Sequence, residues 1–284
     1  MSKIKFTLIN HPENSRPSVI DIVAPIACGL QELGHAVSIS TDVQEDCDLI
    51  IFTEHFYPEI VKDIAKLKNK YAVIQSELLT NDTFNNHVNF RGRLGGFREV
   101  CKKAEFVIYL VGETDVACPA FKCELGYSPH MRVSSDDQNK YDLCFFGTFS
   151  QRRLDLCNEI GTRGYSVCYC SDISTKDRNK VLSQSRWNLG LKPHWNVEFA
   201  SITRINAALH CGTPTLYEHV KPGSRIESIP LTHNGEGSFI DWIADKLGDK
   251  DLWERERKRQ LSEFHKIRIA DILKSGFESI GYKL

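Results

Sequence analysis

The sequence lacks any long apolar segment, since no run approaches the ~18 apolar residues that a membrane-spanning helix requires. Its first ten residues also lack the apolar stretch and small-residue cleavage site of a signal peptide. Neither sign of charge is in excess, because 36 Lys and Arg face 37 Asp and Glu, for a net charge of −1. No global field therefore attracts nucleic acid or an anionic membrane. We expect a cytoplasmic protein without a transmembrane segment.

Metal-binding spacings are also missing, although the chain has ten cysteines. A structural zinc site needs four ligands at workable spacing. Cys168 and Cys170 lie inside an expected strand, and Cys118 and Cys123 have no matching second pair. Thiols stay reduced in the cytosol. We therefore expect buried, unpaired cysteines, with neither a metal ion nor a bound cofactor.

What the sequence has is a regular alternation of short apolar segments with helical patterns. Such alternation indicates α/β architecture with parallel, doubly wound sheets. In the first half, strands are expected at residues 5–10, 36–40, 49–53, 72–75 and 106–111, and helices at 19–33, 58–67 and 91–104. In the second half, strands are expected at 143–146, 167–170, 187–191 and 215–217, and helices at 152–163, 177–183 and 202–211.

The polar segment 134–140 separates the two halves and is the best candidate for a linker. We expect an N-terminal Rossmann-like domain at 1–136, a second at 137–260, and a C-terminal helix at 261–284 that packs back on the body. The helical pattern there runs from residue 250 to about 277, with eight Lys or Arg, five Asp or Glu and an apolar side. Such a helix could contact a membrane surface weakly, but its mixed charges favour packing on the protein.

The first cluster with chemical potential is a glycine turn after the strand at 143–146. Gly147 and Thr148 follow this strand, with Arg152 and Arg153 shortly beyond them. Glycine lets a ligand approach the backbone closely, and the next helix begins where anions are stabilised. Either guanidinium could clamp a phosphate with paired hydrogen bonds. The alternative is a plain turn with both arginines on the helix surface.

The second cluster surrounds the start of the helix expected at 202–211. Ser201 could cap this helix and Arg204 would lie one turn in, so that free N–H groups and a cation form a seat for a diphosphate. Glu198 could bond sugar hydroxyls, but it could also be a helix-terminal charge. The candidates in this cluster are Lys192, His194, Glu198, Ser201, Arg204 and Asn206.

From residue 143 to 218, the order of these features resembles the donor-binding half of glycosyltransferases with the GT-B architecture. The likeness is to spore-maturation-type and family-4-like members. Family-4-like enzymes carry two glutamates eight positions apart, and Glu198 matches the first. The second falls on Asn206, or on Ala207 when counted back from residues 211–214, and neither is Glu. Asn206 could still bond a ribose hydroxyl, while Arg204 and the Gly-Thr-Pro at 212–214 fit the spore-maturation type better.

The resemblance implies two Rossmann-like domains and the transfer of a sugar from a nucleotide-activated donor to an acceptor hydroxyl. It further implies a metal-independent, retaining reaction in carbohydrate biosynthesis, in which Arg153, Lys192 and Arg204 stabilise charge on the leaving group. The acceptor could be a glycan, a lipid-linked molecule or another hydroxyl compound, and nucleic acid stays among the alternatives. The rival functions are a nucleotide-sugar epimerase, a phosphorylase, and a non-catalytic sugar-nucleotide or protein-binding module.

The first domain would supply the acceptor side. Open α/β sheets bind ligands at the carboxyl ends of their strands, where His11, Glu54 and Glu77 follow the first, third and fourth expected strands. An inverting enzyme would need one of them as a general base. A retaining enzyme of the resembled kind needs none, because the donor phosphate can accept the proton. Each residue could also be an ordinary polar loop residue.

Overall fold

The computed structural model describes residues 3–9, 17–44, 46–53, 58–80, 83–84, 91–134, 140–192 and 199–284. The chain forms two compact units. Unit 1 comprises Met1–Leu125 together with Ile269–Leu284, and unit 2 comprises Gly126–Arg268. The sequence placed these boundaries at 136/137 and 260/261. The chain in fact enters unit 2 before the polar segment 134–140, and it leaves unit 2 between two helices.

Unit 1 contains a six-stranded sheet, in the order β2-β1-β3-β4-β5-β6, in which every pairing is parallel. All five residues of β3 are buried, as expected for a strand that helices cover on both faces. Only β6 was not predicted from the sequence. The strands are β1 Lys5–Ile9, β2 Ala36–Ser40, β3 Leu49–Thr53, β4 Lys70–Gln75, β5 Val107–Tyr109 and β6 Ala120–Lys122.

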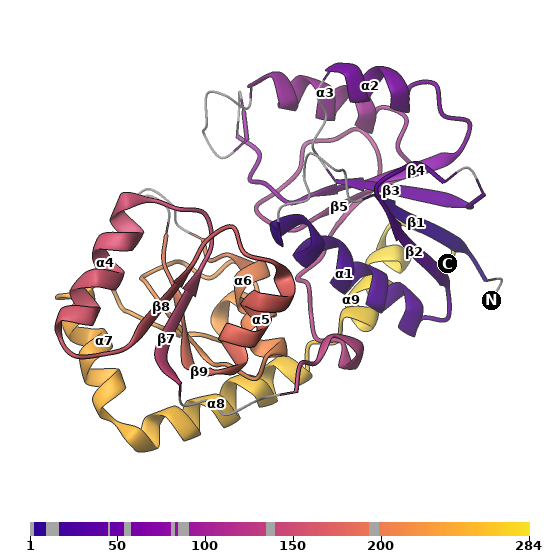
Figure 1. Cartoon of the computed structure of the whole chain (residues 1–284). Helices are drawn as coiled ribbons and strands as arrows, with labels where there is room; N and C mark the ends of the chain where they lie inside the picture. Colours follow the sequence, from indigo (N-terminus) through magenta and orange to yellow (C-terminus); the bar gives the residue numbers. More distant parts are fainter. Residues whose placement is uncertain are drawn as a thin grey trace. The chain divides into compact units, whose positions relative to one another are not determined.

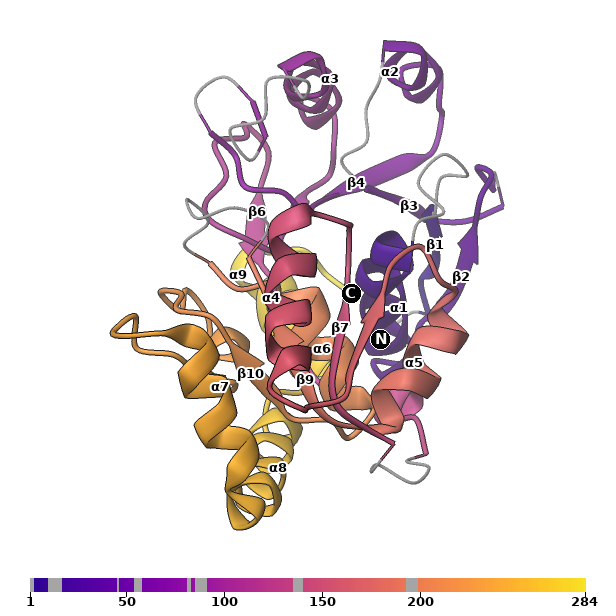
Figure 2. The same ribbon diagram turned by 60° about the vertical axis from the view of Figure 1, so that its left-hand side comes forward.

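Helices cover both faces of this sheet (Figure 2). On one face lie α2 (Pro58–Ile64) and α3 (Arg91–Cys101), which bury Leu94 and Phe97. On the other lie α1 (Pro17–Glu32) and α9 (Ile269–Ser279), packed so closely that a Cβ at Gly29 would come 2.7 Å from Leu273. The C-terminal helix α9 therefore belongs to the same unit as the N-terminal strand.

Unit 2 contains a five-stranded parallel sheet in the order β11-β10-β9-β7-β8. β9 lies at its centre with β7 beside it, and the apolar side chains of both strands are largely buried. The sequence predicted four of the strands, but not the two-residue edge strand β11. The strands are β7 Tyr141–Phe146, β8 Val167–Cys170, β9 Ser185–Gly190, β10 Thr215–Tyr217 and β11 Leu231–Thr232.

Helices lie on both faces of this sheet (Figure 1), and a separate layer of apolar side chains holds them on each face. Phe145 and Trp187 face α4 (Gln151–Thr162) and α7 (Phe239–Gly248). Cys144 and Phe146 face α5 (Thr175–Ser183) and α6 (Ile202–His210) on the opposite side. Because neighbouring residues of a strand point to opposite faces, the continuous apolar run 143–146 serves both layers. Short 3-10 turns lie at Pro129–Met131 and Ile226–Ser228.

The helical segment expected from 250 to 277 is two helices, α8 (Lys250–His265) and α9, which belong to different units. The break comes at residues 266–268, where Ile267 is buried. Phe264 and Phe277 from the apolar sides of these helices are also buried. This packing removes the basis for a membrane-surface contact. Among the described helices, none has both the length and the apolarity to cross a membrane.

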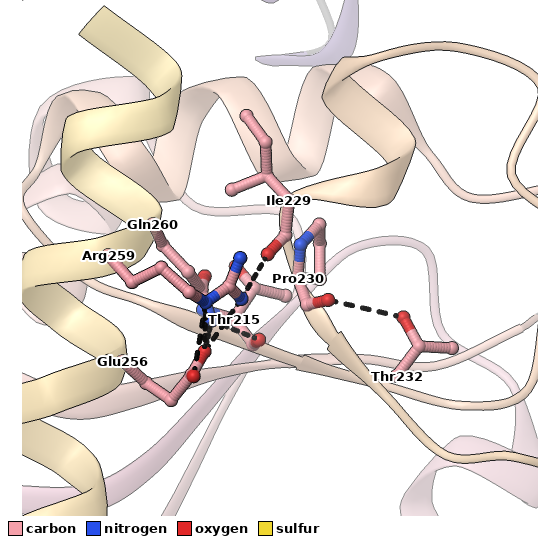
Figure 3. A network of polar contacts seen from close by, with 7 residues as sticks. All are labelled: Thr215, Ile229, Pro230, Thr232, Glu256, Arg259 and Gln260. Carbon is pink, nitrogen blue, oxygen red and sulfur yellow. Dashed lines mark hydrogen bonds and ion pairs between the residues drawn. The ribbon is translucent and has the colours of Figure 1, made fainter.

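A polar network, buried at Thr215 and Gln260, fixes α8 to the sheet of unit 2 (Figure 3). The Thr215 N–H donates to Gln260 Oε1 at 2.8 Å, and Gln260 Nε2 donates back to the Thr215 carbonyl at 3.2 Å. Arg259 donates to the Ile229 carbonyl at 2.7 Å and to Glu256. Gln260 thereby provides hydrogen-bond partners for the backbone N–H and carbonyl of Thr215, the first residue of β10. A buried backbone group without a partner would destabilise the fold.

Each sheet has one point at which the strand order reverses. In unit 1 it lies between β1 and β3, and in unit 2 between β7 and β9. Open α/β sheets bind ligands outside the carboxyl ends of strands at such a switch point, because the loops there diverge and leave a crevice. In unit 2, the loops that follow β7 and β9 are those in which the sequence placed its main candidates.

Candidate anion-binding site

The loop after β7 begins with Gly147, which has a backbone conformation that favours glycine. Its φ is +147°, and a Cβ at this position would come 2.9 Å from Arg204 Nη2. The Gly147 N–H donates to the Cys170 carbonyl at 3.1 Å, at the end of β8. The glycine therefore lets a guanidinium lie against the backbone at the carboxyl end of β7. Thr148 beside it is exposed.

Arg153 lies beneath this loop with 2% of its surface exposed. Its backbone N–H donates to Ser150 Oγ, which caps α4. Its guanidinium donates to the Thr148 carbonyl at 2.9 Å and to the Leu191 carbonyl at 3.0 Å. Burial, and then the neighbouring charge of Arg204, lowers the pKa of Arg153 to about 9. Arg153 therefore joins the loops after β7 and β9, and stays charged at neutral pH.

Arg204 lies in the first turn of α6 and is half-buried. Its Nη1 donates to the Leu191 carbonyl at 3.0 Å, the carbonyl that Arg153 also uses. The Cζ atoms of Arg204 and Arg153 lie 5.5 and 5.2 Å from the ring centroid of Phe145. Burial lowers the pKa of Arg204, while interactions with Tyr217 and Tyr169 oppose this effect. Two guanidiniums thus share one carbonyl and one aromatic ring.

Arg152 has a different role from the one the sequence suggested. It forms a two-pronged ion pair with Glu218, which lies directly after β10. It also donates to the Lys192 carbonyl at 2.9 Å, while the Lys192 N–H donates to Glu218 at 2.5 Å. The side chains of the pair are 16% and 6% exposed. The charge of Arg152 is therefore compensated within the protein, and the pair holds the loop after β9 in place.

The sequence suggested that the Ser201 hydroxyl caps the start of α6, and the structure shows that it does not. Ser201 occupies the N-cap position, but its side chain makes no capping hydrogen bond. Its hydroxyl lies 3.0 Å from that of Thr203. The Ser201 N–H donates instead to the hydroxyl of Tyr217 at 2.8 Å. A tertiary contact from β10 has replaced the local cap.

Asn206 lies on the buried side of α6, with 1% of its surface exposed. Its amide donates to the Gly126 carbonyl at 3.2 Å. One turn later, His210 accepts the Ser128 N–H at 3.1 Å and hydrogen bonds the Asn206 carbonyl at 2.9 Å. Both side chains anchor the segment by which the chain enters unit 2. Asn206 therefore presents no exposed group for the expected ribose contact.

Of the remaining predicted residues, only Glu77 belongs to the part of the chain that the structure describes. Glu77 follows β4 in unit 1, half-buried, and its carbonyl accepts a hydrogen bond from Gln75 at 3.2 Å. His11, Glu54, His194 and Glu198 lie outside the described residues. The structure thus assembles Gly147, Thr148, Arg152, Arg153, Lys192, Ser201 and Arg204 at one edge of the unit 2 sheet.

Sequence reasoning missed Tyr217, which supports the start of α6. The only local signal was its position, as an aromatic residue at the carboxyl end of a strand. The partner that makes this placement informative is Gly190 on β9, which pairs with Tyr217 in the sheet. That pairing joins residues 27 positions apart and cannot be read from local sequence.

The described residues contain no cluster of potential metal ligands. No group of three or more His, Cys, Asp or Glu side chains there is placed to hold an ion. All ten cysteines are unpaired. The guanidinium groups at the switch point could neutralise a bound anion there.

Solved structures match this fold over almost the whole chain, whereas no protein-family model and no curated protein matches the sequence. An alpha-glucosyltransferase in complex with UDP and a 13-mer DNA containing an HMU base has a TM-score of 0.66 and 11% identity, covering 99% of this chain and 100% of its own. The chain has the GT-B fold. This confirms the predicted fold class of two doubly wound, parallel-sheet units.

Two further structures support the same architecture. The T4 phage beta-glucosyltransferase has a TM-score of 0.60 and 12% identity, covering 98% of this chain and 99% of its own. AviGT4, a glycosyltransferase involved in avilamycin A biosynthesis, has a TM-score of 0.57 and 15% identity, covering 98% of both chains. At these identities the residues of the site are not carried over from one protein to another, and the likeness is one of fold.

Proposed function

We propose that this protein is a glycosyltransferase that moves a sugar from a nucleotide-activated donor to an acceptor hydroxyl. The donor diphosphate would bind at the carboxyl edge of unit 2, beside Gly147 and Arg204. Three of the structures that share the fold bear names of sugar-transferring enzymes. A cytoplasmic location and a role in carbohydrate biosynthesis are part of the same proposal.

The observation that carries the proposal is the pair Arg153 and Arg204. Arg153 is buried and Arg204 is half-buried, and burial lowers the pKa of both guanidiniums. Their hydrogen bonds among the described residues go to carbonyl oxygens and to Tyr217, and Glu218 is taken up by Arg152. A bound anion would offset the desolvation and mutual repulsion of these cations. A diphosphate carries such charge and suits the switch point of a doubly wound sheet.

The same residues would assist the reaction. In sugar transfer the bond between the anomeric carbon and the diphosphate oxygen breaks, a bond to the acceptor oxygen forms, and the acceptor proton leaves. Negative charge grows on the departing diphosphate, where Arg204 would stabilise it, with Arg153 behind it. Preorganised charge of this kind is commonly the largest catalytic contribution. We therefore propose a reaction that needs no metal ion.

Two finer features belong to the proposal. The resemblance of residues 143–218 to retaining enzymes supports transfer with retention, in which the donor phosphate accepts the proton. Lys192, two residues after the end of β9, would add a positive charge near the leaving group. His11, Glu54 and Glu77 in unit 1 are the candidates for contacts with the acceptor, and His194 and Glu198 are the candidates for contacts with the donor sugar.

Two solved structures of the same fold guide the choice of acceptors to test. One structure of the same fold was solved with DNA containing an HMU base, and another belongs to avilamycin A biosynthesis. A test panel should therefore include DNA containing an HMU base, free sugars and a lipid-linked glycan.

The test is turnover of UDP-glucose and other nucleotide sugars, with and without this panel. We expect transfer by the wild type, loss of at least about 100-fold in Arg204→Ala, and unchanged turnover in Arg163→Ala. Arg163 ends α4 and forms an exposed ion pair with Asp241, so it controls for the loss of an arginine. Conversion of the donor sugar without an acceptor would instead indicate an epimerase. Binding without any turnover would indicate a non-catalytic module.

A further inference from the structure

Tyr217 and Gly190 form an unusually close pair across β10 and β9. They are direct partners in the parallel sheet, and a Cβ at Gly190 would come 2.1 Å from Tyr217 Cδ2. Only glycine therefore admits the tyrosine ring at this point. The ring is buried, with 2% of the residue exposed. Because residue 190 of β9 has no side chain, the Tyr217 ring can lie across it at the carboxyl edge of the sheet.

The ring ends in a hydroxyl that serves the start of α6. Tyr217 Oη accepts the Ser201 N–H at 2.8 Å, while Ser201 itself provides no side-chain cap. The first N–H groups of a helix have no partner within the helix. A tertiary acceptor therefore fixes the position of the helix start, which in this protein leads within three residues to Arg204.

The same hydroxyl interacts with the Arg204 side chain. A phenol oxygen has two lone pairs, so it can accept from both donors at once. Burial raises the pKa of Tyr217, which keeps it a neutral phenol at physiological pH. The Arg204 guanidinium is thus held between Tyr217, the Leu191 carbonyl and the backbone at Gly147.

We propose that Tyr217 is a positioning residue of the donor site, whose hydroxyl orients the first turn of α6 and Arg204 to receive the diphosphate. This inference rests on the proposed function, because it assigns a supporting role in the same site. Tyr217 would act through Arg204 and the helix start, without touching the donor.

The test compares Tyr217→Phe with the wild type by isothermal titration with UDP and with uridine. The variant keeps the ring that fills the space over Gly190 and removes only the acceptor oxygen. We expect UDP affinity to fall about 10-fold, as for loss of a hydrogen bond to a charged group, and uridine affinity to stay unchanged. The Ser201 amide, followed by hydrogen exchange, should exchange at least about 10-fold faster.

Tyr165→Phe is the matched control. Tyr165 precedes β8 at the amino edge of the same sheet, where its hydroxyl donates to the Ala244 carbonyl at 3.1 Å. Its removal should leave UDP affinity unchanged. Equal UDP affinity in wild type and Tyr217→Phe would overturn the inference and leave the proposed function standing, as would an equal loss for UDP and uridine. If the wild type binds no nucleoside diphosphate, the proposed function fails, and the inference fails with it.

Discussion

The Arg204 guanidinium lies directly against Gly147, so that a methyl group at residue 147 would come within 2.9–3.1 Å of three of its atoms. This contact joins the loop after β7 to the first turn of α6 across the switch point of unit 2. The turn therefore needs glycine for two reasons. Its φ of +147° disfavours other residues, and a side chain at this position would collide with Arg204.

Gly147→Ala should therefore weaken UDP binding in addition to destabilising the protein. We expect about 1–2 kcal/mol loss of stability from the backbone conformation, and displacement of Arg204 from its position. Gly164→Ala separates the two effects, because Gly164 has a φ of +90° with nothing within 4 Å of its Cβ position. It should lose similar stability and keep UDP affinity. Equal UDP affinity in both variants would contradict the role given to Gly147.

The ion pair of Arg152 and Glu218 should contribute to the free energy of unfolding of unit 2, and a double-mutant cycle can measure the coupling between the two residues. Removing one partner leaves the other charge buried, so Glu218→Ala or Arg152→Ala alone should cost about 3 kcal/mol or more. The double variant should cost clearly less than the sum. Unfolding in urea, followed by tryptophan fluorescence, reports on unit 2 because all four tryptophans fall within residues 126–268.

The exposed pair of Arg163 and Asp241 is the control for this cycle. Its side chains are 38% and 65% exposed, and pairs in water contribute about 0–1 kcal/mol. Additive effects at Arg152 and Glu218, like those expected for the exposed pair, would show that the buried pair does not hold the loop after β9.

His210 should make the stability of unit 2 depend on pH. Burial lowers its pKa from 6.5 to about 4, so the folded state binds fewer protons than the unfolded state between these values. The contribution is complete above pH 6.5 and is lost as pH falls towards 4, by about 3 kcal/mol in total. In His210→Gln, the urea midpoint should fall less between pH 7 and 4.5 than in the wild type.

His219→Gln serves as the comparison, since His219 is exposed on the loop after β10. The urea midpoint of this variant should change with pH as that of the wild type does. If the urea midpoint changed with pH equally in His210→Gln and in the wild type, the neutral His210 would not anchor the segment at Ser128 by which the chain enters unit 2.

Local sequence patterns predicted the fold well, because apolar runs and their spacing decide which segments become strands. The run 143–146 and its glycine turn were placed correctly, and β9 and α6 were found within one or two residues. The helix break at 266–268 was missed because Ile267 continues the apolar side. At the break the Ile267 carbonyl accepts the Tyr127 N–H at 2.7 Å, a contact far along the chain that local sequence does not reveal. The elements β6, β11 and α7 were also missed.

The site could be predicted only in part. Gly147, Arg153 and Arg204 do meet, since strand ends at a switch point converge by topology. The roles of Ser201, Asn206 and Arg152 depend on partners far along the chain, namely the Tyr217 hydroxyl, the Gly126 carbonyl and the Glu218 carboxylate. These distant partners hydrogen bond the groups that the sequence analysis had assigned to a ligand.

The central claim is that Arg204 and the backbone at Gly147 hold a diphosphate, and calorimetric titration with UDP tests it most directly. We predict that the wild type binds UDP, that Arg204→Ala weakens the binding by about 10- to 100-fold, and that Arg163→Ala leaves it unchanged. Equal binding of UDP to the wild type and Arg204→Ala, or no binding to the wild type, would contradict the account.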